Sequence, residues 1–456
     1  MEIQNLVASQ REFFKTKTTY NVNYRLEALN RLLLNIKTME RDITDALRID
    51  LGKSAEEAYL TEIGMTYEEL RFMIGHVKKF SGDHRVATPL VHFHGRSFRR
   101  PVPYGNVLVM SPWNYPFLLA LVPTIDALAA GNTVIIKPGS YSEATGIVIK
   151  KLIEATFDSA YVAVVLGGRD ENKTLLDQKF DYIFFTGSTS VGRFVMEKAA
   201  AHLTPVTLEL GGKSPAIVDM TADLAMAARR IVFGKLINCG QTCIAPDYLI
   251  VHKLIKPQFI DLLIGEIKRQ YGADSLKVGR YGKIINKKHF ERLSALIANE
   301  KLAYGGRTVP DQLKIEPTIL EEATLDSPAM NEEIFGPILP VLTFENTEDI
   351  AAIIEKHPTP LALYLFTKDQ VREKEILTYV PFGGGCVNDT IVHIATTKMP
   401  FGGVGNSGMG GYHGYEGFKT FSHYKSILKK SNRPDIAIRY QPYTPLKTRL
   451  IKWFLK

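Results

Sequence analysis

The sequence predicts an α/β fold built around a doubly wound, mostly parallel sheet. From about residue 106, short apolar runs rich in Val and Ile alternate with longer stretches whose apolar residues recur at helical spacing. This alternation is typical of parallel sheets that carry helices on both faces. The chain has 456 residues, of which 45% are hydrophobic and 23% charged, as in a globular protein with two or three domains.

The part of the chain before this alternation is predicted to be helical. Its apolar residues recur every three or four positions. They are Leu26, Leu29, Leu32, Leu33 and Ile36, followed by Tyr67, Leu70, Met73, Ile74 and Val77. Residues 86–103 break the pattern with alternating, β-branched and basic residues, and they predict an extended hairpin with Gly95 at its turn.

The alternation itself divides into two α/β regions. In the first we expect strands at 106–110, 133–137, 161–166 and 182–185, and helices at 116–130, 143–157 and 191–202. Pro116 would occupy the first helical turn, where proline is favourable. The second region runs from about residue 209 to residue 401, with expected strands at 216–218 and 338–344 and a helix at 254–271.

The cysteine and charge content restrict the compartment and the partners. Only three cysteines occur, which favours a reducing compartment over a disulfide framework. Because the first residues do not resemble a signal peptide and no apolar run is long enough to cross a membrane, we expect a cytoplasmic protein. The net charge of +8 comes from residues 425–456, with nine basic residues and one acidic residue, but no nucleic-acid recognition motif accompanies them.

The basic tail at 433–456 predicts an amphipathic helix. Leu446, Leu450, Trp453 and Phe454 fall at i, i+4, i+7 and i+8, while basic residues take other positions. A helix of this kind can lie on an anionic membrane surface. It can equally pack on its own or on a partner subunit, and the sequence leaves both open.

Cys243, in the segment GQTC at 240–243, is a candidate nucleophile. Small residues before it allow close approach to the backbone, and a thiolate forms more readily where a helix N-terminus or a positive charge lowers its pKa. An isolated intracellular cysteine is more often buried and structural, which is our interpretation of Cys239. The spacing of the two also permits a reversible Cys239–Cys243 disulfide, whereas no cluster of His or Cys supports a metal site.

Glu209 and Asn114 are a candidate base and a candidate hydrogen-bond donor. Glu209 ends an apolar strand, where loss of solvation would raise its pKa towards that of a useful base. Asn114 lies at a strand-to-helix junction, where its amide can donate to an oxyanion together with the backbone N–H of Cys243. Taken singly, Glu209 is more consistent with a cap or an ion pair, and Asn114 with a helix cap.

A weaker signal points to a dinucleotide. The segment FTGSTSVG at 185–192 leads from a predicted strand into a predicted helix, with glycines at Gly187 and Gly192. Backbone N–H groups at such a junction can approach a pyrophosphate. The chain lacks the G-x-G-x-x-G pattern after the first strand of the alternation, so this segment alone does not identify a cofactor.

Six segments in order resemble the NAD(P)-dependent aldehyde dehydrogenases. They are SPWNYP at 111–116, FTGSTSVG at 185–192, ELGGK at 209–213, GQTCIA at 240–245, EEIFGP at 332–337 and PFGG at 400–403. The resemblance extends from about residue 20 to about residue 430. The segment GGVGNSGMG at 402–410 is similar to the class 3 branch, which includes fatty and aromatic aldehyde dehydrogenases.

The resemblance implies covalent catalysis without a metal. Cys243 would add to the aldehyde, Asn114 would hold the oxyanion of the thiohemiacetal, and Glu209 would activate the water that hydrolyses the thioester. The cofactor, NAD or NADP, would be bound by Lys137, Ser140, Gly187, Ser188, Gly192, Glu333 and Phe335. Ser140 stands where the family commonly has a glutamate for the ribose 2′-hydroxyl, so we expect NADP+ to be accepted alongside NAD+.

The resemblance also implies a division of the chain and a homodimer. The dinucleotide-binding domain would comprise residues 1–85 and 104–208, and the α/β catalytic domain residues 209–401. A small β element for oligomerisation would comprise residues 86–103 and 415–432.

The substrate and two alternative functions stay open. The apolar segment 391–395 is expected to line a tunnel for medium- or long-chain aliphatic or aromatic aldehydes, or else to be a buried strand with one satisfied histidine. One alternative is a CoA-acylating enzyme, which needs no base to activate water. The other is a structural or membrane-surface role on the same fold. The combination of thiol, carboxylate and amide favours oxidation of aldehydes to carboxylic acids.

Overall fold

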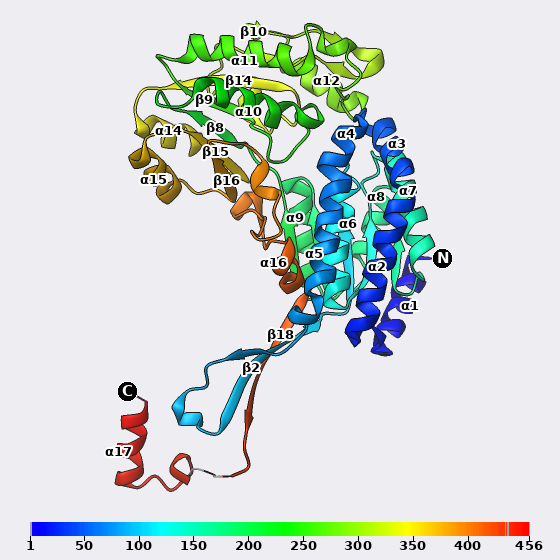
Figure 1. Cartoon of the computed structure of the whole chain (residues 1–456), viewed down its shortest axis with the longest axis vertical. Coiled ribbons are helices and arrows are strands. Elements are labelled where there is room, and N and C mark those ends of the chain that lie inside the picture. The colour runs from blue at the N-terminus through cyan, green and yellow to red at the C-terminus, as the bar shows by residue number, and fades with distance from the viewer. Residues whose placement is uncertain (1, 434, 436, 456) are drawn as a thin grey trace.

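The computed structural model describes residues 2–433, 435 and 437–455. Two large α/β sheets with their helices form the body of the molecule, and a narrow β arm extends away from it (Figure 1). Both large sheets are mostly parallel, so the predicted fold class is confirmed.

The first sheet has six strands in the order β17-β7-β6-β3-β4-β5, of which only β17 is antiparallel to its neighbour. The strands are β3 (Asn106–Met110), β4 (Thr133–Lys137), β5 (Val162–Val164), β6 (Tyr182–Thr186), β7 (Val206–Glu209) and β17 (Gly408–Met409). The helices between them are α6 (Leu118–Ala130), α7 (Glu143–Thr156), α8 (Arg169–Leu176) and α9 (Thr189–Ala200).

Helices cover both faces of this sheet, as a doubly wound fold requires. In β3, Val107 and Val109 enter the large core beneath α2, α5, α6 and α7, whereas Leu108 and Met110 enter a second core beneath α1, α8 and α9. The N-terminal helices are α1 (Ile3–Lys15), α2 (Val22–Thr38), α3 (Glu40–Leu51), α4 (Ala55–Ala58), the π-helical turn η2 (Tyr59–Ile63) and α5 (Gly64–Phe80). The predicted helical N-terminal part is therefore confirmed.

The second sheet has seven strands in the order β10-β13-β14-β9-β8-β15-β16. They are β8 (Pro215–Val218), β9 (Tyr248–His252), β10 (Leu302–Tyr304), β13 (Thr318–Leu320), β14 (Ile338–Phe344), β15 (Ala362–Phe366) and β16 (Gly384–Val387). The helices of this part are α10 (Leu224–Leu236), α11 (Lys256–Tyr271), α12 (Lys287–Ala295), α13 (Pro328–Asn331), α14 (Thr347–Ile354) and α15 (Gln370–Tyr379). A short hairpin of β11 (Thr308–Val309) and β12 (Lys314–Ile315) lies outside the sheet.

The arm is a three-stranded antiparallel sheet of β1 (His84–Val86), β2 (Gly95–Pro103) and β18 (Ser422–Lys430). Strands far apart in the sequence pair along its whole length, from Ser422 opposite Pro103 to Lys430 opposite Gly95. Helix α16 (Gly414–Thr420) leads into β18 from the body. The tail ends in α17 (Pro445–Phe454), which lies near the far end of the arm (Figure 1).

Two predicted details are wrong. The helix expected to begin at Pro116 begins at Leu118, because the Glu62 carboxylate accepts hydrogen bonds from the N–H groups of Phe117 and Leu118 and so determines its first turn. Gly95 is the first residue of β2 and not the turn of the hairpin, because residues 87–94 form a longer connection. A Cβ at Gly95 would lie 2.6 Å from the carbonyl oxygen of His92, so close packing against this connection requires glycine there.

Candidate active site

An unusual backbone turn presents Cys243 to the interior. Asn238, Cys239 and Gly240 have φ angles of 52°, 53° and 73°, which are left-handed values. A Cβ at Gly240 would lie 2.3 Å from the carbonyl oxygen of Gly336, so only glycine fits this approach of two loops. The turn directs Cys239 into a hydrophobic core beside Tyr281, away from Cys243, and all three cysteines are free. The structural role predicted for Cys239 agrees with this burial.

Glu209, the last residue of β7, is buried without a partner. The residue is 2% exposed, and neither oxygen of its carboxyl group has a hydrogen-bond partner among the described residues. Burial therefore raises the pKa of Glu209 well above its usual range, in the direction that the sequence predicted. Neither a cap nor an ion pair accounts for this carboxyl group.

The pKa of the Cys243 thiol is raised as well. Burial, together with the negative charges of Glu333 and Glu209, raises the pKa of the thiol to about 12. The expected source of a lowered pKa is missing, because Cys243 lies on a turn and not at the N-terminus of a helix. Hydrogen bonds from the backbone N–H groups of Cys243 and Ile244 act in the opposite direction and lower the pKa.

Asn114 connects its own loop to the loop of the nucleophile. Its side-chain nitrogen donates to the carbonyl oxygen of Gln241 at 3.0 Å, and its carbonyl oxygen accepts from the amide of Asn238 at 2.7 Å. Helix α6 begins four residues later, so Asn114 is not its cap. Because a side-chain amide has two N–H groups, the second one is free to donate to an oxyanion.

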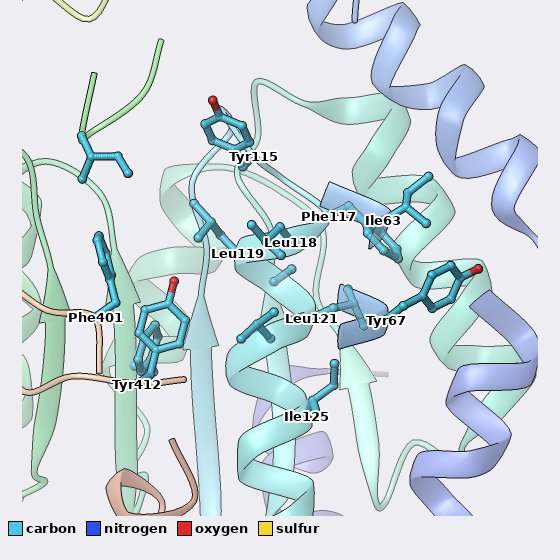
Figure 2. Close-up of a cluster of buried hydrophobic side chains, with 14 of the residues drawn as sticks. Ile63, Tyr67, Tyr115, Phe117, Leu118, Leu119, Leu121, Ile125, Phe401 and Tyr412 are labelled. Carbon is cyan, nitrogen blue, oxygen red and sulfur yellow. The ribbon is translucent and has the colours of Figure 1, made fainter. Parts of the chain in front are cut away.

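Two cavities meet at Cys243 and Glu209. The first has a volume of about 160 Å³ and mostly apolar walls, formed mainly by Leu60, Met65, Tyr115, Leu118, Leu119, Phe233, Ile391, Val392, Ile394, Phe401 and Tyr412. In Figure 2, Leu119 of α6 lies across from the rings of Phe401 and Tyr412. The second has a volume of about 570 Å³ and polar as well as apolar walls.

The segment 391–395 lines the apolar cavity, as the sequence predicted, but it is not a strand. Val392–Ile394 form a turn of 3₁₀-helix. His393 is absent from the cavity wall, and its Nδ1 lies 3.6 Å from Sγ of Cys386. Burial lowers the pKa of His393 to about 4, so this histidine is neutral.

The second cavity has features that fit a dinucleotide. Gly187, Ser188, Glu333 and Phe335 all line it, and Gly187 and Ser188 lie at the junction from β6 to the N-terminus of α9. One carboxyl oxygen of Glu333 is buried without a partner, which suits a hydroxyl donor such as that of a ribose. Burial and the charge of Asp247 raise the pKa of Glu333 to about 8.

Three residues expected to bind the cofactor do not line this cavity. Gly192 packs under Leu210, where a Cβ would lie 2.6 Å from Cδ2 of the leucine. The ammonium of Lys137 is buried and donates to the carbonyl oxygens of Pro138 and Gly167, both at 2.8 Å. Ser140 is exposed on the loop after β4.

The sequence did not predict several residues of the two walls. Lys288, His289 and Arg292 of α12 line the polar cavity, and the ring of His289 lies 5.3 Å from that of Trp113. No sequence motif identifies α12 as part of the site, because the contact of His289 with Trp113 depends on how the second α/β region packs against the first. Tyr115, which lines the apolar cavity, could have been predicted, because it is an aromatic residue within the segment 111–116.

The raised pKa of Cys243 makes a testable prediction for the cofactor-free protein. Because the thiolate is the form that reacts, alkylation by iodoacetamide should accelerate about tenfold per pH unit between about pH 7 and about pH 10. Mass spectrometry of the peptide that contains Cys243 measures the rate. A plateau below about pH 9 would show an ionised thiol at that pH and contradict the structure.

Comparison with known proteins identifies similar proteins over the whole length of the chain. The Aldehyde dehydrogenase family matches residues 1–427. The 4,4'-diaponeurosporen-aldehyde dehydrogenase of Staphylococcus aureus is 45% identical over 456 residues, which cover 100% of this chain and 99% of that protein. Aldehyde dehydrogenase family 3 member H1 of Arabidopsis thaliana is 42% identical and covers 99% of this chain and 94% of its own.

Two further proteins extend the comparison. The rat aldehyde dehydrogenase described as dimeric and NADP-preferring is 42% identical over 96% of this chain and 98% of its own. The solved structure of substrate-bound Staphylococcus aureus AldH superposes with a TM-score of 0.98 at 44% identity and covers 100% of both chains. The chain belongs to the aldehyde dehydrogenase family, which confirms the resemblance that its six segments indicate.

Proposed function

We propose that Cys243, Glu209 and Asn114 carry out the oxidation of an aldehyde to a carboxylic acid with NAD(P)+. The observation that supports it is the meeting of an apolar cavity and a polar cavity at the thiol and the carboxyl group. The thiol of Cys243 gives up its proton to water, and Sγ adds to the aldehyde carbon to give a thiohemiacetal in its anionic form. Its oxyanion accepts hydrogen bonds from the free amide N–H of Asn114 and the backbone N–H of Cys243.

NAD(P)+, when bound, would accept the hydride that the thiohemiacetal gives up. Loss of the hydride from the thiohemiacetal leaves a thioester on Cys243, and Glu209 then takes a proton from the water that attacks it. The C–S bond breaks, the carboxylic acid leaves, and Sγ of Cys243 takes the proton from Glu209 and remains on the protein as the free thiol. Because Glu209 must be ionised to act as a base, we infer that water entering beside it restores part of its hydration and lowers its pKa. A CoA-acylating enzyme needs no such base, so the buried Glu209 favours water as the acyl acceptor.

The aldehydes that fit best are medium- or long-chain aliphatic or aromatic ones. The apolar cavity offers almost no polar group apart from those at the reacting end. An apolar chain gains free energy by leaving water for such a wall, about 0.8 kcal/mol for each buried methylene. The Staphylococcus aureus relative is named for one aldehyde, 4,4'-diaponeurosporen-aldehyde.

Turnover of an aliphatic aldehyde series tests the chemistry. With saturating NAD+, kcat/KM should rise about threefold to fourfold for each added methylene until the chain exceeds the cavity, and Cys243→Ala should abolish NADH formation. Cys386→Ala is the matched control, because Cys386 lines neither cavity, and it should keep activity. NADH formation by Cys243→Ala, or turnover that requires CoA, would contradict the proposal.

The cofactor proposal is that both NAD+ and NADP+ are used. Ser140 is exposed and uncharged, so the loop after β4 places no carboxylate near a 2′-phosphate. The rat relative is described as NADP-preferring, which supports this proposal. Glu333, Ser188 and Phe335 are proposed to hold the nicotinamide half, whereas contact of Lys137 and Gly192 with the dinucleotide stays a prediction.

The substitution Ser140→Glu tests the cofactor proposal. A carboxylate at this position should lower kcat/KM for NADP+ by about tenfold to about a hundredfold through charge repulsion and leave that for NAD+ nearly unchanged. Ser140→Gln, which has the same size without the charge, is the control. If the wild-type enzyme uses NADP+ with less than about one-hundredth of its efficiency with NAD+, a difference of about 2.7 kcal/mol, the proposal is wrong.

The arm is proposed to join two subunits. It projects from the body (Figure 1). Apolar side chains are exposed at Leu428 of β18 and at Leu90 and Phe93 of the connection between β1 and β2. The rat relative is described as dimeric. We propose the division into dinucleotide-binding residues 1–85 and 104–208, catalytic residues 209–401, and oligomerisation strands at 86–103 and 415–432.

The tail is proposed to touch an anionic membrane surface on the cytoplasmic side. Helix α17 exposes Leu446, Leu450, Trp453 and Phe454 together with basic residues. None of the helices in the described part of the chain is long and apolar enough to span a bilayer. Contact would therefore be peripheral.

Deletion of residues 444–456 tests the tail. The shortened protein should lose binding to vesicles that contain phosphatidylserine and keep its turnover of a short soluble aldehyde. The double substitution Arg449→Gln/Lys452→Gln should weaken binding by about 2 kcal/mol, since each basic residue contributes about 1 kcal/mol at such a surface. Unchanged vesicle binding after the deletion would contradict the proposal. A change of oligomeric state, without any vesicle binding by the full chain, would favour packing of the tail on a partner subunit.

A further inference from the structure

A fully buried ion pair lies directly behind Asn114. Nζ of Lys53 and Oε1 of Glu62 are 2.5 Å apart, and neither side chain is exposed at all. Lys53 follows α3, and Glu62 lies on the π-helical turn η2. Neither residue lines either cavity, so neither can touch substrate or cofactor.

The second carboxyl oxygen of Glu62 holds the start of α6. It accepts from the backbone N–H of Phe117 at 2.8 Å and from that of Leu118 at 3.2 Å. N–H groups in the first turn of a helix have no partner within the helix, and a negative charge there is stabilised by the helix dipole. Glu62 therefore determines where the loop that carries Asn114 ends.

The ammonium of Lys53 contacts the loop itself. It lies 3.4 Å from the carbonyl oxygen of Asn114 and 4.0 Å from the centre of the Tyr115 ring. The hydroxyl of Tyr115 in turn lies 2.6 Å from Oγ1 of Thr242, the residue before the nucleophile. A chain of direct contacts thus runs from the ion pair through residues 114 and 115 to the loop of Cys243.

The same π-helical turn forms part of the apolar cavity. Leu60 and Thr61 line the cavity, whereas Glu62 turns away from it towards α6. π-Helical turns are rare and occur frequently at functional sites. Here the turn connects the wall that would touch the substrate chain to the loop that would hold its oxygen.

We propose that Lys53 and Glu62 are positioning residues that hold the amide of Asn114 where the oxyanion forms. Stability alone does not account for the pair, because replacing a buried ion pair by uncharged residues of similar volume is often neutral or stabilising. Placement does account for it, because a shift of about 1 Å in a catalytic group can reduce the rate about a hundredfold. The inference rests on the proposed role of Asn114.

The double variant Lys53→Met/Glu62→Gln tests the proposal. It removes both charges, keeps similar volumes and leaves an oxygen at position 62 to accept from α6. At saturating NAD+, kcat should fall between about tenfold and about a hundredfold, while KM for NAD+ should stay within about twofold. Alkylation of Cys243 by iodoacetamide forms no oxyanion, so its rate should stay within about twofold of the wild-type rate.

A partly buried ion pair elsewhere in the protein provides the control. Arg372 and Asp219 form an ion pair away from both cavities, and Arg372→Met/Asp219→Asn should leave kcat unchanged. Unchanged kcat in Lys53→Met/Glu62→Gln would overturn the proposal. So would a parallel loss of kcat and alkylation rate with a lowered Tm, because that result shows a purely structural role.

The variant Asn114→Ala separates the role of the ion pair from the role of Asn114 itself. Loss of kcat in Asn114→Ala with normal kcat in Lys53→Met/Glu62→Gln overturns only the role of the ion pair. Wild-type kcat in Asn114→Ala overturns the proposed role of Asn114, and the positioning role fails with it.

Discussion

The burial of Glu209 and the partial burial of Cys243 are the constraint on which the rest of the site depends. Burial raises the pKa of both groups in the cofactor-free protein. In such surroundings a hydrogen bond or a nearby charge has more effect than in water. Ionisation of the thiol and of the carboxyl group is thus coupled to what enters the two cavities, and a substrate, a cofactor or a water molecule changes their protonation directly.

Asn114 and Glu333 are proposed to form hydrogen bonds with a ligand, so the backbone that carries them must be held in place by neighbouring residues. Next to Asn114 this support is the ion pair of Lys53 and Glu62, and next to Glu333 the buried ion pair of Lys213 and Asp247 has a corresponding place. The ammonium of Lys213 bonds to Asp247 and donates to the carbonyl oxygen of Glu332 at 2.9 Å, while Asp247 accepts from the N–H of Ile334 at 2.9 Å. The backbone on both sides of Glu333 is therefore held, while one of its carboxyl oxygens stays free for a ligand.

Sequence reasoning succeeded where local pattern determines structure and failed where distant residues do. The strands at 106–110, 133–137 and 338–344 match the structure residue for residue, because continuous apolar runs are typical of strands buried on both faces. The start of α6 could not be predicted, because its cap is Glu62, far away in the sequence. The position of Gly192 under Leu210 and the contact of α12 with Trp113 likewise depend on packing between elements. The high pKa of Cys243 has the same origin, since burial and two distant carboxyl groups cause it.

Contacts between the motifs explain why they were informative together and weak alone. A Cβ at Gly211 would lie 2.2 Å from Oε2 of Glu333, so the segment 209–213 approaches 332–337 through a glycine. Gly240 approaches Gly336 in the same way, and the side chain of Asn114 donates to Gln241. Four segments distant in the sequence thus form one network of direct contacts around Cys243 and Glu209. A change in any segment alters the geometry of the others, so each residue type is required by a neighbour in another segment and not by its own local sequence.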